Sequence, residues 1–191
     1  QQACEATHIK GTQSASLLDR RMACLHERRT ELQTLTQLLS REDLDGPLLS
    51  KALPAAYQLT PIKSCGDIPT LTAAVRPPSD ATVKAQVEKL RNDLARIKTL
   101  QHAGRLKDAL QLATQATDAA NRTRYGPVIA LALLRRARLE GLTGKSADAE
   151  THLYDSIERA AAAHDDSTMA HSMVHLVRVV GEGDVDHPVA R

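Results

Sequence analysis

Two segments of the chain carry the same residue pattern 40 positions apart, and this spacing constrains the fold more than any other feature. In "LQHAGRLKDALQLATQA" Gly104 separates two apolar runs, and in "LTGKSADAETHLYDSIERA" Gly144 does the same. Ala109 and Ala149 follow at the same offset from their glycines. Glycine readily takes the left-handed conformation that ends a helix, and alanine lets the next helix pack closely. The pattern therefore predicts two copies of helix, glycine corner and helix.

Apolar residues recur at spacings of three and four along most of the chain, and no alternating strand pattern is found. The sequence has no Phe, no Trp and three Tyr, and a core of Ala and Leu suits closely packed helices. We predict an all-α fold of α-hairpin repeats, of about 40 residues each, with an N-terminal helical subdomain. Helices are expected at 14–39, 47–57, 68–74, 80–102, 106–121, 127–142, 146–163 and 167–180, with Ser79 or Asp80 capping the fourth and Pro54 as an alternative end of the second.

The stretch "RPPSD" is the expected boundary between two parts of the chain. Residues 1–78 would form a helical N-terminal subdomain with a Pro-rich linker, and residues 79–191 a repeat domain. The repeat domain would hold two full repeats and a partial third. Met173 and Val177 fall 40 positions after Leu133 and Ala137, whereas "VGEGDVDHPVAR" does not read as a second helix.

The repeated corners resemble the tetratricopeptide repeat (TPR). The matching positions are Gly104, Leu106, Ala109 and Ala116 in the first copy, and Gly144, Ser146, Ala149 and Ser156 in the second. The period departs from the usual 34 residues, and the aromatic and Pro positions are poorly kept. A phosphate-binding loop at "TGKS" is excluded, because Leu139 stands where its first Gly would be and no strand precedes it.

The resemblance implies a concave groove lined by the first helix of each unit. Equivalent positions there hold Lys98, Arg138 and Arg178. The positions one turn earlier hold Leu94, Leu134 and Val174, which would form an apolar strip. Several cations in a concave site favour a carboxylate, a phosphate or an acidic peptide. The alternative is that these cations are merely solvated on an exposed helix face. The expected partner-binding residues are Arg91, Leu94, Lys98, Leu134, Arg135, Arg138, His171, Val174, His175 and Arg178.

A metal site is a weaker alternative. His171 and His175 lie four residues apart on one expected helix, close enough to share an ion. The stretch reads "HSMVH", which is not the HExxH motif, and His164 is the one further histidine nearby. The residues therefore indicate no metal and no cofactor.

Three cysteines leave their pairing open, since no CxxC or zinc spacing is present. All three could be free buried thiols. One disulfide with a thiol left over is the rival reading, and a Cys4–Cys24 bridge would need a chain reversal near Gly11.

Composition excludes some function classes. A net charge of +2 and the near absence of aromatic side chains disfavour nucleic-acid binding. No apolar run is long enough to span a membrane. The chain opens at Gln1, which suggests a segment of a longer protein.

Further residues of the N-terminal half resemble the region that follows the catalytic domain in a group of TPR-containing bacterial serine/threonine protein kinases. The matching residues are Cys4, Thr7, Gln13, Ser14, Leu18, Asp19, Arg21, Met22, Cys24, Leu25, Arg28, Leu53, Pro54, Cys65 and Asp67. The resemblance implies a sensory or partner-binding region, often placed after a transmembrane helix. The side of the membrane stays open: the segment is either the extracytoplasmic part of a membrane-anchored kinase or cytoplasmic. The segment has no Gly-rich loop, HRD or DFG motif.

We therefore expect a non-catalytic regulatory module that binds a protein or an acidic peptide, or its own kinase domain, through the basic groove. The alternatives are a self-association scaffold that forms a homo-oligomer, and a metal-dependent site at His171 and His175.

Overall fold

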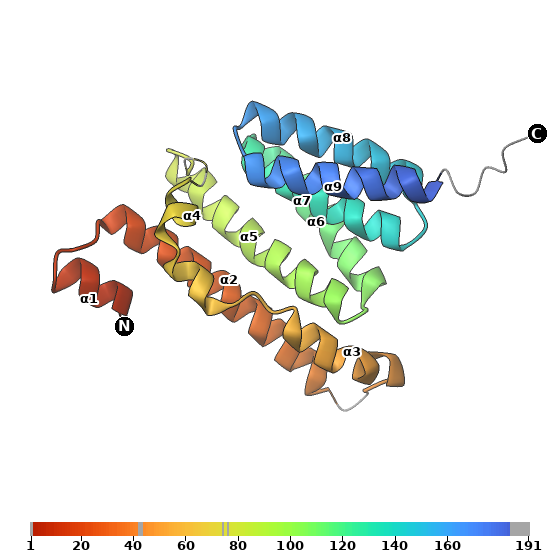
Figure 1. Cartoon of the computed structure of the whole chain (residues 1–191), viewed down its shortest axis with the longest axis horizontal. Coiled ribbons are helices and arrows are strands. Elements are labelled where there is room, and N and C mark those ends of the chain that lie inside the picture. The colour runs from red at the N-terminus through yellow and green to blue at the C-terminus, as the bar shows by residue number, and fades with distance from the viewer. Residues whose placement is uncertain (1, 42–43, 74, 76, 184–191) are drawn as a thin grey trace, which may run out of the picture.

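The computed structural model describes residues 2–41, 44–73, 75 and 77–183, and this part of the chain is helical, without strands (Figure 1). The all-α prediction is therefore confirmed. The N-terminal half holds α1 (Gln2–His8), α2 (Ala15–Leu39), α3 (Gly46–Tyr57), the 3-10 helix η1 (Ile62–Gly66) and α4 (Ile68–Ala73). The C-terminal half holds α5 (Ala81–His102), α6 (Leu106–Thr123), α7 (Gly126–Leu142), α8 (Ser146–Ala162) and α9 (Asp166–Gly183).

Side-chain caps begin α2, α3 and α5. The side chains of Ser14, Asp45 and Asp80 accept hydrogen bonds from the backbone N–H three residues ahead. Asp80 is thus the cap of α5. Pro54 lies inside α3, which continues to Tyr57, so an early end of this helix is wrong. Short α1 and η1 were not predicted, and Ala74, the expected last residue of α4, lies outside the described residues.

The 40-residue spacing holds at both kinds of corner in the C-terminal half. Gly104 and Gly144 end their helices at φ values of +77° and +78°, in the left-handed region. The corners between successive hairpins also repeat: Arg124 and His164, 40 residues apart, have φ values of 55° and 53°. The first and second helical hairpins therefore turn in the same way, α5 onto α6 and α7 onto α8.

Small residues allow these helices to approach closely. Ala109, Ala113 and Ala149 are completely buried, as is Leu153. The position that matches the last alanine of the TPR corner is Ser156 in the second hairpin. Its buried hydroxyl lies 2.8 Å from both the Ala130 carbonyl oxygen and the Ser172 hydroxyl, and so connects α7, α8 and α9.

Helix α2 packs along α5, so the two halves share one hydrophobic cluster (Figure 1). Leu35 and Leu38 of α2 are buried with Leu94 and Ile97 of α5. The division into domains at residue 78 stays a prediction. This packing places the polar side of α2 beside the first helix of the repeat region, where the groove was expected.

A disulfide joins Cys24 to Cys65, with a Cα–Cα distance of 5.6 Å, and Cys4 is free and exposed. The predicted Cys4–Cys24 bridge is therefore wrong, as is the reading of three free buried thiols. The expected reversal does occur at Gly11, where φ is +61°. It brings α1 back only to the start of α2, where Gln13 donates to Thr7 at 2.8 Å, while η1 carries Cys65 to Cys24.

Candidate functional site

The first helices of the repeat region lie in sequence order, since α7 contacts both α5 and α9. This arrangement brings Arg138 of α7 and Arg178 of α9 together: after burial, the positive charge of Arg178 is what lowers the pKa of Arg138. Arg135, one turn earlier on α7, is close enough to lower the pKa of Lys98. The predicted cations thus form one connected group along α5, α7 and α9.

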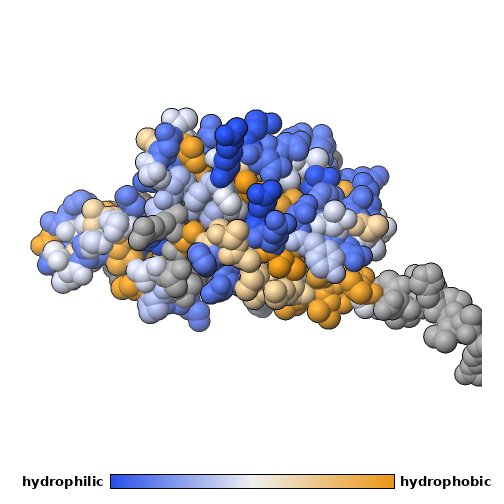
Figure 2. Space-filling model, turned by 90° about the horizontal axis from the view of Figure 1, so that it is seen from above, coloured by the Kyte–Doolittle hydropathy of each residue, from blue (hydrophilic) through white to orange (hydrophobic). Residues whose placement is uncertain are grey.

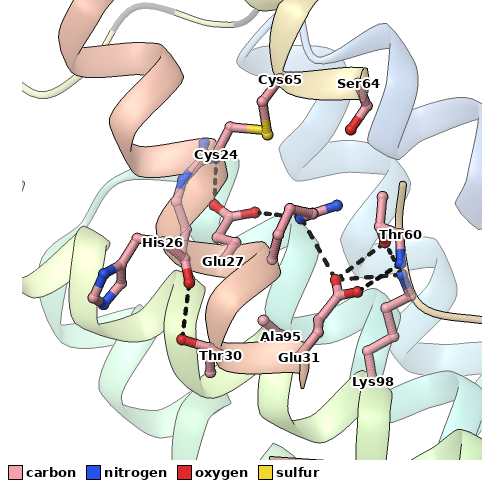
Figure 3. Close-up of polar contacts among 12 residues, drawn as sticks. Cys24, His26, Glu27, Thr30, Glu31, Thr60, Ser64, Cys65, Ala95 and Lys98 are labelled. Carbon is pink, nitrogen blue, oxygen red and sulfur yellow. Dashed lines mark hydrogen bonds and ion pairs between the residues drawn. A yellow bond between two sulfur atoms is a disulfide. The ribbon is translucent and has the colours of Figure 1, made fainter. Parts of the chain in front are cut away.

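Lys98, however, already has a partner within the chain. Its Nζ lies 3.4 Å from a carboxylate oxygen of Glu31 on α2 and donates a hydrogen bond to the Thr60 hydroxyl. Figure 3 shows Glu31 pointing toward Thr60 and Lys98 from the α2 side. Thr60 completes the cluster by donating its backbone N–H to Glu31 at 2.9 Å. Burial lowers the pKa of Lys98, and the Glu31 carboxylate opposes this shift.

A second carboxylate, Glu27, lies one turn before Glu31 on the same side of α2. Arg91 of α5 reaches Glu27 at 3.5 Å. Arg28 lies 3.0 Å from Glu27 and 3.5 Å from Glu31. Helix α2 therefore presents an acidic edge to the α5 end of the basic group. The sequence analysis missed Glu27, Glu31 and Thr60; the spacing of four between the two glutamates was the signal available.

A cavity of about 160 Å³ lies between α2, α5 and α7. Its lining residues are Glu27, Arg28, Glu31, Thr60, Arg91, Leu94, Ala95, Lys98, Leu131 and Arg135. The Nε of Arg135 is buried without a hydrogen-bond partner. Burial is the main reason that the pKa of Arg135 falls to about 10, and the positive charge of Arg138 adds to it, while Glu31 and Glu27 oppose it.

A smaller hollow of about 80 Å³ lies at the α9 end of the group, lined in part by Arg138, His175 and Arg178. Burial lowers the pKa of His175 to about 4, and the charges of Arg138, His171 and Arg178 act in the same direction. The imidazole is consequently neutral near pH 7. His102 on α5 has a lowered pKa for the same reasons, burial first and then Lys98, Arg138 and Arg135.

The expected apolar strip does not form the floor of a groove. Leu94 lines the larger cavity, but Leu134 is buried in the core with Ala137 and Leu153. Val174 lies on the opposite, outer face of α9 and is 68% exposed. Equivalent positions on α7 and α9 have different environments, because among the described residues no further helix packs on the outer face of α9.

That outer face of α9 is the most apolar exposed surface among the described residues of the repeat region. It consists of Met173, Val174, Val177 and Val180. The residues 40 positions earlier, Leu133, Leu134, Ala137 and Glu140, are all buried. Figure 2 shows hydrophobic residues gathered at the end of the molecule where α9 lies. The same helix face is therefore buried on α7 and open to solvent on α9.

The two histidines of the alternative metal site lie on α9 without further ligands. Nδ1 of His171 donates to the carbonyl oxygen of Ser167 at 2.7 Å. Within residues 2–41, 44–73, 75 and 77–183, no group of three or more His, Cys, Asp or Glu side chains could hold a metal ion. The metal-dependent alternative has no support here.

No helix in the described part of the chain has the length and apolar character needed to cross a bilayer. The connected cations and the acidic edge of α2 are the features from which a function can be inferred. No family model, curated protein or solved structure matches this chain.

Proposed function

We propose that this chain is a non-catalytic, TPR-like binding module that holds an acidic segment of a protein along α7 and α9. One observation carries the proposal: Arg135 and Arg138 are crowded with Arg178 and His175, and neither Arg135 nor Arg138 forms an ion pair with a described residue. Cations that repel one another in a partly desolvated site raise the local potential and favour an anionic ligand.

Helix α2 supports the choice of ligand. It packs against the α5 end of the cationic group and directs Glu27 and Glu31 at Arg91 and Lys98. Carboxylates carried on a helix are thus compatible with this surface, and among the described residues α2 directs these two glutamates only at α5. The ligand we propose continues the series of carboxylates that α2 begins.

The experiment measures the binding of a fluorescein-labelled hexaglutamate peptide by fluorescence anisotropy at low and high salt. The double variant Arg138→Glu with Arg178→Glu should bind roughly tenfold or more weakly, because it replaces attraction with repulsion. The matched control is Lys107→Glu with Arg122→Glu on α6, where both residues are exposed. Equal binding by the two double variants would contradict the proposal.

We also propose that the module regulates a larger signalling protein, as the resemblance to bacterial serine/threonine kinases implies. Its own kinase domain would then be one source of the acidic segment. The Cys24–Cys65 disulfide favours an oxidising compartment, which agrees with an extracytoplasmic position. Binding of a separately expressed kinase domain, compared with the Arg138 and Arg178 double variant, tests this relationship.

Self-association is a second candidate function, and the outer face of α9 favours it. Val174 and Val177 are 68% and 74% exposed on one side of the helix. Two copies could bury these faces against each other. Sedimentation velocity of the wild type and of Val174→Lys with Val177→Lys decides the matter: a concentration-dependent dimer that the double variant abolishes supports it, and a wild-type monomer at all concentrations contradicts it.

A further inference from the structure

Arg135 lines the cavity between α2, α5 and α7 with a half-buried side chain whose Nε is shielded from water. Its Nε is buried without a hydrogen-bond partner, and Arg135 makes no ion pair with the residues that the structure describes. A buried charge without a partner costs stability. Such a residue in a cavity is typical of a site that a ligand completes.

The other charged side chains around the cavity already form ion pairs with one another. Arg91 pairs with Glu27, Lys98 pairs with Glu31, and Arg28 lies between both carboxylates. Four cations and two carboxylates line the cavity, which leaves a surplus of two positive charges. The ligand group should therefore be an anion, and Arg135 is the cation left to receive it.

The volume and lining of the cavity indicate which kind of anion suits it. Its volume of about 160 Å³ corresponds to roughly five water molecules at about 30 Å³ each. Leu94, Ala95 and Leu131 supply apolar wall. A planar carboxylate on a short aliphatic stem suits this combination, because a guanidinium binds carboxylate in a bidentate manner and the stem contacts the apolar wall. The carboxylates of Glu27 and Glu31 would repel a phosphate dianion more strongly than a single negative charge.

We infer that this cavity is a binding site for one Asp or Glu side chain of the ligand, with Arg135 as the residue that binds its carboxylate. The inference rests on the proposed function, since the Arg138 and Arg178 surface continues from this cavity. It adds a defined position at which one acidic residue is recognised.

A ligand-binding role and a purely structural role of Arg135 predict opposite effects of its replacement on the melting temperature. Without ligand, Arg135→Met should raise the melting temperature, because a side chain of similar length removes a half-buried charge that has no ion-pair partner among the described residues. Arg135→Gln is the second variant if the methionine variant does not fold. Arg122→Met, at an exposed position of α6, is the matched control and should leave the melting temperature unchanged.

The test combines thermal denaturation with peptide binding. Sodium glutarate at constant ionic strength, with sodium chloride as reference, should raise the melting temperature of the wild type and of Arg122→Met but not of Arg135→Met. Hexaglutamate with an amidated C-terminus should bind Arg135→Met roughly 10- to 100-fold more weakly than wild type. A glutarate effect that survives Arg135→Met, or a lowered melting temperature in both Arg135 variants, would overturn the inference.

Further arms identify the anion and separate this inference from the proposed function. Stabilisation by inorganic phosphate but not by glutarate would overturn the choice of carboxylate, and binding of hexaglutamate only with a free C-terminus would overturn the choice of a side chain. Hexaglutamate binding that depends on Arg138 and Arg178 but not on Arg135 would refute the cavity site alone. An Arg135-dependent glutarate effect without any hexaglutamate binding would refute the proposed function and leave the cavity site standing.

Discussion

The Nζ of Lys98 on α5 lies 3.4 Å from the carboxylate of Glu31 on α2, across a sequence separation of 67 residues. The positive charge of Lys98, the first of the three predicted groove cations, is therefore neutralised by a carboxylate of the same chain. Within the part of the chain that the structure describes, Arg138 of α7 has no comparable ion pair with a carboxylate of α2, so the surface is divided into a part neutralised by α2 and a part around Arg138 that remains cationic. Function is expected from the second part.

Glu31→Gln should lower the free energy of unfolding by about 3 to 5 kcal/mol, since a buried charge network loses one partner. Glu31 is 3% exposed and accepts hydrogen bonds from Thr60 as well as from Lys98. Urea denaturation measures the change, with Glu158→Gln on the exposed face of α8 as control. Equal stabilities of the two variants would show that the Glu31 network contributes little.

Reduction of the Cys24–Cys65 disulfide should lower the free energy of unfolding by about 4 kcal/mol, because it frees a loop closed across 41 residues. Urea denaturation with and without a dithiol reductant measures the loss. The variant Cys24→Ser with Cys65→Ser should have the stability of the reduced wild type, and this stability should be the same with and without the reductant. Cys4→Ser, which removes the free thiol, should behave as wild type.

Stability should fall with acidification between pH 6.5 and 4. His175 has a pKa lowered from 6.5 to about 4 in the folded protein, so the unfolded chain binds this proton at a higher pH than the folded chain does. Protonation therefore favours unfolding in this window, whereas above pH 6.5 both states are neutral and His175 adds no pH dependence. His175→Gln should show a flatter profile of melting temperature against pH, and exposed His26→Gln should keep the wild-type slope.

Gly144→Ala should cost about 1 to 2 kcal/mol, the penalty for an L side chain in the left-handed region. At φ +78° an added Cβ would meet no atom within 4 Å, so the cost is conformational and not a clash. Gly181→Ala is the matched control: this glycine lies in α9 with equally open space, and alanine there should be neutral or stabilising. Similar losses in the two variants would contradict the role assigned to the glycine corner.

The long helices could be predicted because their signals are local. Helix caps at Ser14 and Asp80 and glycine corners at 104 and 144 depend on residues a few positions apart. Short α1 and η1 lack such signals, and η1 is what brings Cys65 to its partner. The disulfide could not be predicted without it.

The candidate site was predictable only in part, because a helix pattern does not say what covers each face. Arg135, Arg138 and His175 lie near one another, and their part in binding stays a prediction. Glu27 and Glu31, by contrast, lie on the polar face of α2. The spacing of apolar residues predicts that this face is exposed to solvent, yet in the structure it faces the cations of α5. The surroundings of Glu27 and Glu31 are set by the tertiary packing of α2 on α5, which the spacing of residues within α2 does not reveal.

Helix α2 is synthesised well before the residues that it packs against. Thr30 and Asn92 are separated by 62 residues, and Glu31 and Lys98 by 67. A ribosome adds about 5 to 20 residues per second, so on the order of 3 to 13 seconds pass between the synthesis of Glu31 and that of Lys98. During translation the apolar side of α2 therefore lacks its native partner for seconds, so α2 acquires its tertiary contacts only after a much later part of the chain has been made.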